Sequence, residues 1–309
     1  MEGIFSWLNQ PLFQDSFIRI WMVIAVGVGL AMAGILALVL IKKRKKTERD
    51  EPGVQEPVTE EPEPLPVLEL GNLQGLGNRE EQQDAFGISR MERIEKDGLL
   101  AVLCDGMGGM AEGGMIAAET VAEMIGMFPW EDDDAILEWV RQRSGRVYQQ
   151  FRGHGGTTVV AALLREQRLS FWCVGDSDLF LLREGKLYAL NVRQEFKNDL
   201  VLRALESGFS VDEAFTDPQA GALSEYIGKE DVRCDYTYKP FFLQPEDVLL
   251  LCSDGVSDTL TLKQIREAMA LSPQACCDEL ESKILAAGKP NQDNYTAIVL
   301  KYHGKGEEK

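Results

Sequence analysis

Four aspartates lie in four short, separate motifs: Asp84 in REEQQDAFG, Asp105 in AVLCDGMGG, Asp254 in LLLCSDGVSD and Asp293 in NQDNYTAIVL. Carboxylates held close together repel one another and are costly to desolvate, so a convergent cluster would need cations. Magnesium or manganese suits an all-oxygen, water-rich shell, whereas zinc usually recruits histidine or cysteine. The chain has two histidines, and its six cysteines show no CxxC spacing. The pattern therefore predicts a Mn²⁺ or Mg²⁺ site and disfavours zinc.

Each motif taken alone also fits a local role. Asp105 stands in a glycine-rich turn, Asp254 precedes a glycine, and Asp293 precedes an asparagine. Aspartate, glycine and asparagine are common in turns and helix caps for local reasons. A single motif would leave this alternative open.

Apolar runs typical of strands position three of these aspartates. LLAVLCD (99–105) ends at Asp105, EDVLLLCS (246–253) ends directly before Asp254, and NYTAIVLKY (294–302) begins directly after Asp293. Strands of this kind can deliver carboxylates to a common edge of a sheet.

The remaining apolar spacing indicates helices and further strands. We expect helices at 113–128, 133–151, 196–206 and 262–285, and an antiparallel meander over 157–190. Two packed sheets with helices outside them bury such a mixture of elements. The predicted fold class is α+β.

An apolar segment without charged side chains, residues 20–41, is long enough to cross a hydrocarbon core of about 30 Å as a helix. The basic run at 42–46 places its C-terminal side in the cytoplasm by the positive-inside rule. Glutamate and proline dominate 47–69, a composition typical of an extended spacer. The predicted segments are an extracytoplasmic stretch (1–19), a transmembrane helix (20–41), a basic stop with an acidic linker (42–69), a folded domain (70–303) and a polar tail (304–309).

The composition excludes some functions. The chain has 309 residues, of which 45% are hydrophobic, enough for a substantial core. Its net charge of -18 disfavours nucleic acid as a partner, because binding a phosphate backbone needs clustered cations. Cys104, Cys173 and Cys252 lie in apolar strand-like runs, which indicates buried thiols in a reducing compartment.

Six motifs in order carry a resemblance that covers about residues 70–302. They are GNREEQQDAF, DGMGG, GGTTVVAAL, VGDSDLFLL, LCSDGVSDTL and NQDNYTAIVL. Together they resemble the metal-dependent protein serine/threonine phosphatases of the type 2C (PPM) family, in a form that looks bacterial. In the first motif Arg79 and Asp84 match the family pattern, with Gln82 in place of the usual asparagine.

The resemblance implies a four-layer αββα sandwich, two mainly antiparallel sheets flanked by helices, with two Mn²⁺ or Mg²⁺ ions at one edge. It implies the following roles: Asp105 bridges both ions, Asp84 and the carbonyl of Gly106 support the first, Asp254 and Asp293 hold the second, and Arg79 grips the substrate phosphate. Arg79, Asp84 and Asp105 are thus the predicted catalytic residues. The alternative for Arg79 is a surface salt bridge with Glu80 or Glu81.

The chain departs from the family pattern at several positions. Met107 stands where many eukaryotic relatives have a histidine acid, so water is expected to protonate the leaving group. No aspartate lies within 149–156, which argues against a third ion. The segment that follows the meander, LNVRQEFKND (190–199), corresponds to a flap in the family. In this flap, Asn191 and Arg193 stand where relatives often have a DH pair. In GDSD we expect a structural role for Asp176 and a surface position for Asp178.

The resulting functional prediction is a membrane-anchored, cytoplasm-facing phosphatase of phosphoserine and phosphothreonine proteins that opposes a serine/threonine kinase. A metal-activated water would hydrolyse the ester, and no protein nucleophile is needed. The alternative is a weak or inactive phosphatase-like module that binds a partner at the membrane. Only the first predicts turnover, although both predict Mn²⁺ binding.

Overall fold

The computed structural model describes residues 67–107, 112–208, 210–239 and 241–304. The predicted membrane helix at 20–41 and the acidic linker up to residue 66 lie outside the described residues. Within the described part of the chain, no helix combines the length and apolar character needed to cross a bilayer. The first described strand begins at Leu68, slightly before the predicted domain start at residue 70.

One sheet has five strands, each antiparallel to its neighbours. Their order is β1 (Leu68–Gly75), β11 (Tyr295–Tyr302), β10 (Asp247–Cys252), β6 (Asp178–Arg183) and β7 (Lys186–Ala189). All six residues of β10 are buried, because both faces of this central strand are covered. Its near-continuous apolar run follows from that position.

The second sheet is also antiparallel and is built mainly from the middle of the chain. Its order is β2 (Asp84–Ile88), β3 (Leu99–Asp105), β4 (Val159–Arg165), β5 (Arg168–Val174) and β8 (Asp235–Tyr236), with β9 (Phe241–Phe242) also paired to β5.

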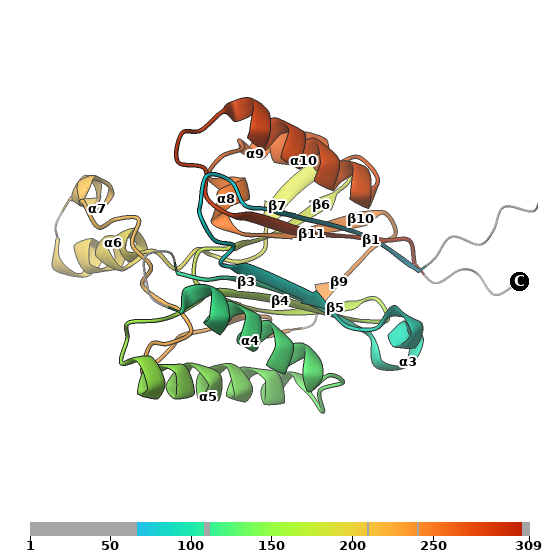
Figure 1. Ribbon diagram of the computed structural model, residues 1–309, viewed down its shortest axis with the longest axis horizontal. Helices are drawn as coiled ribbons and strands as arrows, with labels where there is room; N and C mark the ends of the chain where they lie inside the picture. The colour runs from blue at the N-terminus through green and yellow to red at the C-terminus, as the bar shows by residue number, and fades with distance from the viewer. Residues whose placement is uncertain (1–66, 108–111, 209, 240, 305–309) are drawn as a thin grey trace, which may run out of the picture. The chain divides into compact units, whose positions relative to one another are not determined.

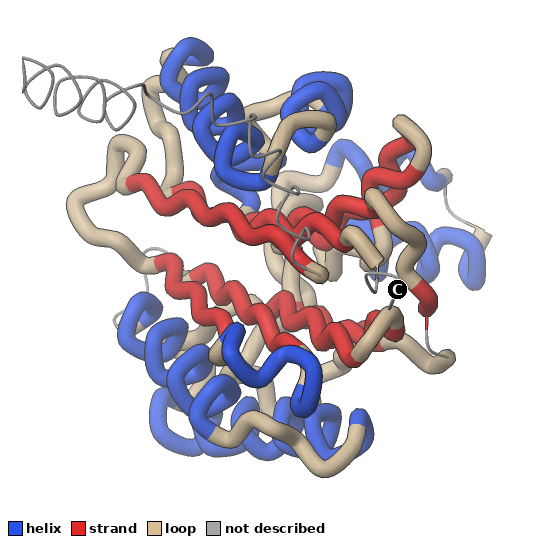
Figure 2. Tube along the Cα trace, turned by 90° about the vertical axis from the view of Figure 1, so that its right-hand side faces the viewer, coloured by secondary structure: helices blue, strands red, loops and turns tan. Residues whose placement is uncertain are grey.

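Helices cover the outer face of each sheet, so the domain has four layers (Figures 1 and 2). The second sheet is covered by α4 (Gly113–Gly126) and α5 (Asp133–Phe151), and the first by α9 (Leu262–Met269) and α10 (Pro273–Ala287). Three apolar cores fill the spaces, one under each helical layer and one between the sheets. This confirms the predicted α+β sandwich.

Smaller elements lie at the ends of the sandwich. At the right of Figure 1, a short 3-10 helix, η1 (Met91–Arg93), leads into α3 (Ile94–Asp97). At the left, α6 (Phe196–Ser207) and α7 (Val211–Thr216) project from the body, and α8 (Asp254–Ser257) follows β10.

Capping residues explain several helix boundaries. The Asp132 carboxylate accepts the amide hydrogen of Ala135, which starts α5 at the predicted residue. Thr261 and Gln264 form a capping box that starts α9. The helical stretch predicted at 262–285 is helical but interrupted: it forms two helices, because Pro273 opens a new one at its first turn.

The meander predicted over 157–190 needs a correction. Its strands pair as two hairpins, β4 with β5 and β6 with β7, and the hairpins belong to different sheets. The chain crosses between the sheets at Gly175, whose φ of 105° suits glycine. The cysteines predicted to be buried, Cys104, Cys173 and Cys252, are buried free thiols.

Candidate metal centre

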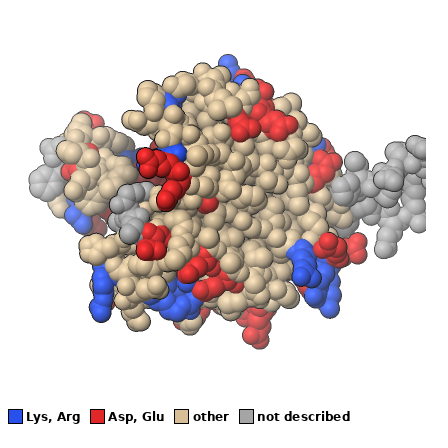
Figure 3. All heavy atoms as spheres, viewed as in Figure 1, with Lys and Arg blue, Asp and Glu red and all other residues tan. Residues whose placement is uncertain are grey.

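The four predicted aspartates reach one end of the sandwich in two pairs, one from each sheet. Asp84 opens β2 and Asp105 closes β3, and the two are direct cross-strand partners. Asp254 follows β10 and Asp293 precedes β11. The two strands are neighbours in the first sheet, and both aspartates lie at the end of these strands where Cys252 faces Ala297. This is the left end in Figure 1, and Figure 3 shows acidic atoms on that side of the surface.

A hydrogen bond links the two pairs. The Ser253 hydroxyl donates to Asp84 Oδ2 at 2.8 Å and accepts the amide hydrogen of Thr296 at 3.0 Å. Ser253 is fully buried, so its hydroxyl has a fixed environment. The first sheet thereby orients a carboxylate of the second.

Burial, with the charges of neighbouring aspartates, raises the pKa of three of these four carboxyl groups. Burial, with the charges of Asp254 and Asp293, raises the pKa of Asp84 to about 6. Burial and the charge of Asp84 raise the pKa of Asp105 well above its ordinary value. Burial raises that of Asp254, with Asp258 and Asp293 adding to the shift. The charged forms are therefore poorly stabilised by the protein's own groups.

Two carboxylate oxygens remain unpaired in this cluster. Asp84 Oδ1 and Asp254 Oδ1 are buried and have no hydrogen-bond partner among the described residues. In that same part of the chain, no three or more acidic, histidine or cysteine side chains lie close enough together to hold a metal ion in their present positions. The arrangement is an open set of oxygen donors, and unpaired buried carboxylates of this kind fit a hard divalent cation.

Gly106 follows Asp105 at a very crowded position. A Cβ there would lie 2.5 Å from the carbonyl carbon of Gly113 and 2.6 Å from the oxygen of Gln83. Its own amide donates to that Gln83 oxygen at 3.1 Å. Only glycine therefore lets the chain pass here beside the aspartates.

Arg79 lies on the loop between β1 and β2 and contacts the cluster directly. Its Nη2 donates to Asp293 Oδ2 at 2.6 Å, and the two side chains are 47% and 39% exposed. The salt bridge considered with Glu80 or Glu81 is thus replaced by one with Asp293. Asn294 holds this loop, because its side chain donates to the oxygen of Leu76 and accepts from the amide of Gln83.

A family model described as "Protein phosphatase 2C" matches residues 76–287, which include Arg79 and three of the four aspartates. The chain belongs to the protein phosphatase 2C family.

Curated relatives of this 2C phosphatase chain come from bacteria. It is 29% identical over 210 residues to "Serine/threonine protein phosphatase PstP" of Mycobacterium tuberculosis, covering 65% of this chain and 40% of PstP. It is 27% identical over 218 residues to "Serine/threonine phosphatase stp" of Listeria welshimeri, covering 65% and 83%. The match thus spans less than half of PstP.

Solved structures show the same fold. A bacterial serine phosphatase structure matches with a TM-score of 0.63 at 25% identity, covering 77% of this chain and 99% of that one. The catalytic domain of PstP in complex with two manganese ions matches with a TM-score of 0.60 at 25% identity, covering 77% and 99%.

Sequence reasoning did not identify some residues that support the site. Ser253 and Asn294 each stand beside a predicted aspartate, but their contacts are with distant segments: Ser253 bonds to Asp84 of the other sheet, and Asn294 bonds to the loop between β1 and β2. Asp176 is mostly buried, and burial together with the charge of Asp254 raises its pKa to about 7. Its predicted structural role stays a prediction.

The expectation that Asp178 faces the surface is wrong. Asp178 is buried, and both of its oxygens accept hydrogen bonds from Arg193. Arg193 also donates to Asp258 at 2.7 Å and Ser257 at 2.6 Å. The arginine in the altered flap therefore ties β6 to α8, beside Asp254.

Proposed function

We propose that the chain hydrolyses phosphoserine and phosphothreonine in proteins at a centre that holds two Mn²⁺ or Mg²⁺ ions. The observation that carries this proposal is the convergence of four carboxylates at one end of the sandwich: burial and neighbouring charges raise the pKa of three of them, and two have unpaired buried oxygens. Family membership supports it, as does the similarity to serine/threonine phosphatases of two bacteria.

The residues present fit the metals that the family implies. Asp84 and the Gly106 carbonyl would support one ion, Asp254 and Asp293 the other, and Asp105 both. Bound ions of this kind lower the pKa of a coordinated water and stabilise charge on the entering and leaving oxygens. The donor set is oxygen only, which favours Mn²⁺ or Mg²⁺ over zinc.

The chain's own side chains contribute binding and orientation. Arg79 stays charged, and its planar guanidinium has donors left for two phosphate oxygens beyond the one that Asp293 accepts. Ser253 fixes the rotamer of Asp84 through its hydroxyl. Met107 has no proton to donate to the leaving group, so water supplies that proton in this scheme. The attacking nucleophile is also water, and no protein side chain attacks the phosphorus.

We also propose that the domain is tethered to the cell membrane through residues 20–41, with the amino terminus outside and the catalytic domain in the cytoplasm. The uncharged apolar segment and the basic run at 42–46 support this topology. The partners would be phosphorylated proteins and a cognate serine/threonine kinase, without nucleic acid.

The test compares the native full-length chain with Asp254→Asn, using a phosphothreonine peptide and Mn²⁺. We expect phosphate release that requires Mn²⁺ and is lost in Asp254→Asn. Asp134→Asn, an exposed carboxylate on α5, is the matched control and should keep the native rate. A folded chain that binds Mn²⁺ but releases no phosphate would contradict the proposal and favour the inactive binding module.

A further inference from the structure

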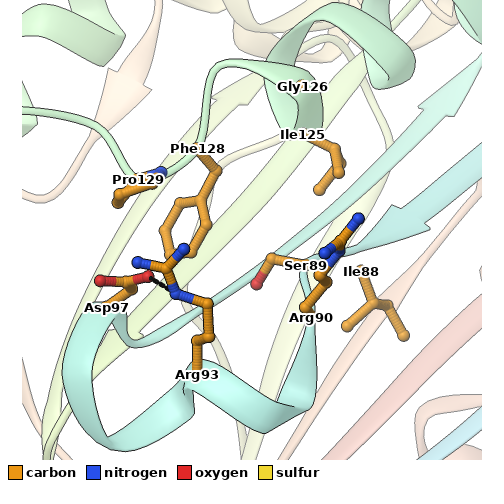
Figure 4. Close-up of a pocket in the computed structure, with 9 residues that line it drawn as sticks. All are labelled: Ile88, Ser89, Arg90, Arg93, Asp97, Ile125, Gly126, Phe128 and Pro129. Atoms are coloured by element: carbon orange, nitrogen blue, oxygen red, sulfur yellow. Dashed lines mark ion pairs between the residues drawn. The ribbon is translucent and has the colours of Figure 1, made fainter.

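A cavity of about 510 Å³, whose lining residues are drawn in Figure 4, lies at the end of β2 and α4 that is far from the aspartates. One wall comes from the end of β2 and the segment that follows it, with Ser89, Arg90 and Arg93. The other comes from the end of α4 and the next connection, with Ile125 and Phe128.

This cavity is separate from the metal centre. Asp84 and Ile88 are the two ends of β2, which at about 3.3 Å per residue lie roughly 13 Å apart. On the facing element, α4 begins near the aspartates at Gly113 and ends at the cavity with Gly126, about 20 Å away at 1.5 Å per residue. A ligand in the cavity would not touch the proposed phosphate site.

The cavity carries excess positive charge. Arg93 Nε pairs with Asp97 Oδ2 at 2.6 Å, which accounts for the carboxylate in the lining. The exposed Arg90 side chain has no hydrogen bond or ion pair with any described residue. One guanidinium is therefore free to pair with an anion, in a chain whose net charge is -18.

A buried hydroxyl adds a second polar contact. Ser89 is 6% exposed, and its Oγ accepts the amide hydrogen of Leu100 at 2.9 Å. The hydroxyl hydrogen has no acceptor among the described residues, so it can donate to a ligand. In Figure 4 it lies on the wall that carries Arg90, across from Phe128.

The rest of the lining is apolar. Ile88, Ile125, Phe128 and Pro129 contribute carbon surface, and a volume of this size is typical of small-molecule sites. We propose that this cavity binds a small organic anion, with an acidic group paired to Arg90 and hydrogen-bonded by Ser89, and an apolar body against Ile125 and Phe128. The proposal does not depend on the phosphatase activity.

The test uses para-trifluoromethylbenzoate as the probe and fluorine NMR line broadening with the native full-length chain as the readout. We expect saturable broadening, and binding weaker by about five- to tenfold in Arg90→Gln, because a charge-assisted hydrogen bond is lost at an exposed side chain, where solvent weakens it. The neutral para-trifluoromethylbenzamide should bind the native chain as weakly as the acid binds Arg90→Gln. Equal binding of acid and amide, or no saturable broadening by the acid, overturns the proposal.

A second pair of variants tests the location. A Cβ at Gly126 would have no heavy atom within 4 Å, so Gly126→Leu should fill the cavity without disturbing the fold. Gly145 on α5 is equally open but lies outside the cavity, so Gly145→Leu is the matched control. Loss of probe binding in Gly126→Leu alone supports the site, and unchanged binding in Gly126→Leu overturns it. Circular dichroism melting checks that both variants fold.

Discussion

Buried carboxylates occur in two kinds of surroundings in this domain. Buried carboxylates other than the four aspartates are matched by cations: Asp247 accepts hydrogen bonds from Arg183, Asp178 from Arg193, and Glu225 from Lys229 and Arg233. In the cluster, Asp84, Asp105 and Asp254 face mainly one another, and Arg79 pairs with the partly exposed Asp293.

The difference separates carboxylates with a structural partner from the proposed metal ligands. A buried charge matched by a cation can persist without a ligand, whereas a buried charge beside like charges is costly until something cationic binds. The family motifs pointed to the same residues, but the contrast in pairing is an independent physical reason. Removing a carboxylate should therefore have opposite consequences in the two regions.

The largest effect is expected for Asp105→Asn. Its carboxylate is the predicted bridge between two ions, so kcat/KM should fall by more than the roughly 10- to 100-fold typical of a residue that only supports a ligand. The metal-free variant should be at least as stable as the native chain, because one repelling charge is gone. Phosphate release and urea unfolding measure the two quantities, and a marked loss of stability would break the contrast.

Asp247→Asn should give the reverse pattern. Asp247 is 2% exposed, and its loss leaves Arg183 without its carboxylate partner. We expect the free energy of unfolding to drop by about 3 kcal/mol, at the lower end for a broken buried pair because Arg183 is partly exposed. The folded variant should retain native kcat and KM, and a selective fall in kcat without a fall in stability would contradict its structural role.

Ser253→Ala sharpens the comparison within the cluster itself. Without the hydroxyl, Asp84 Oδ2 loses its donor and its fixed orientation. Mn²⁺ affinity should fall by about 10- to 100-fold, as for other residues that orient a metal ligand. Calorimetric titration with Mn²⁺ measures the change. The buried Ser144, whose hydroxyl contacts Lys229 and Gly228 instead, gives Ser144→Ala as a control with unchanged affinity.

The smallest effect concerns pH. The pKa of Asp84 is about 6 in the folded chain against an ordinary 3.8, so between these values the folded state binds more protons than the unfolded state. The contribution of Asp84 to the stability of the metal-free chain should therefore decrease as pH rises from about 4 to 7. Urea unfolding across this range should show that slope, and Asp84→Asn should reduce it. An unchanged slope in the variant would show that Asp84 is not its source.

Local patterns predicted much of the fold and of the candidate site. Three of the four aspartates stand at the ends of apolar strand runs, and helix α5 begins and ends at the predicted residues, with Asp132 capping its first turn. Side-chain contacts between segments far apart in the sequence could not be predicted, because local spacing says nothing about which segments the fold brings together. The pairing of Arg79 with Asp293 joins residues that are 214 positions apart, and the Ser253–Asp84 bond spans 169. The buried position of Asp178 also depends on a distant partner, Arg193, whose approach is set by tertiary packing.

Mn²⁺ stoichiometry measured by calorimetry on the metal-free full-length chain tests the central claim most directly. If the unmatched carboxylates form a two-ion centre, the native chain should bind two Mn²⁺ per chain, Asp105→Asn should lose at least one, and Asp247→Asn should still bind two. Binding of no Mn²⁺ by the native chain, or equal losses in the two variants, would contradict the account.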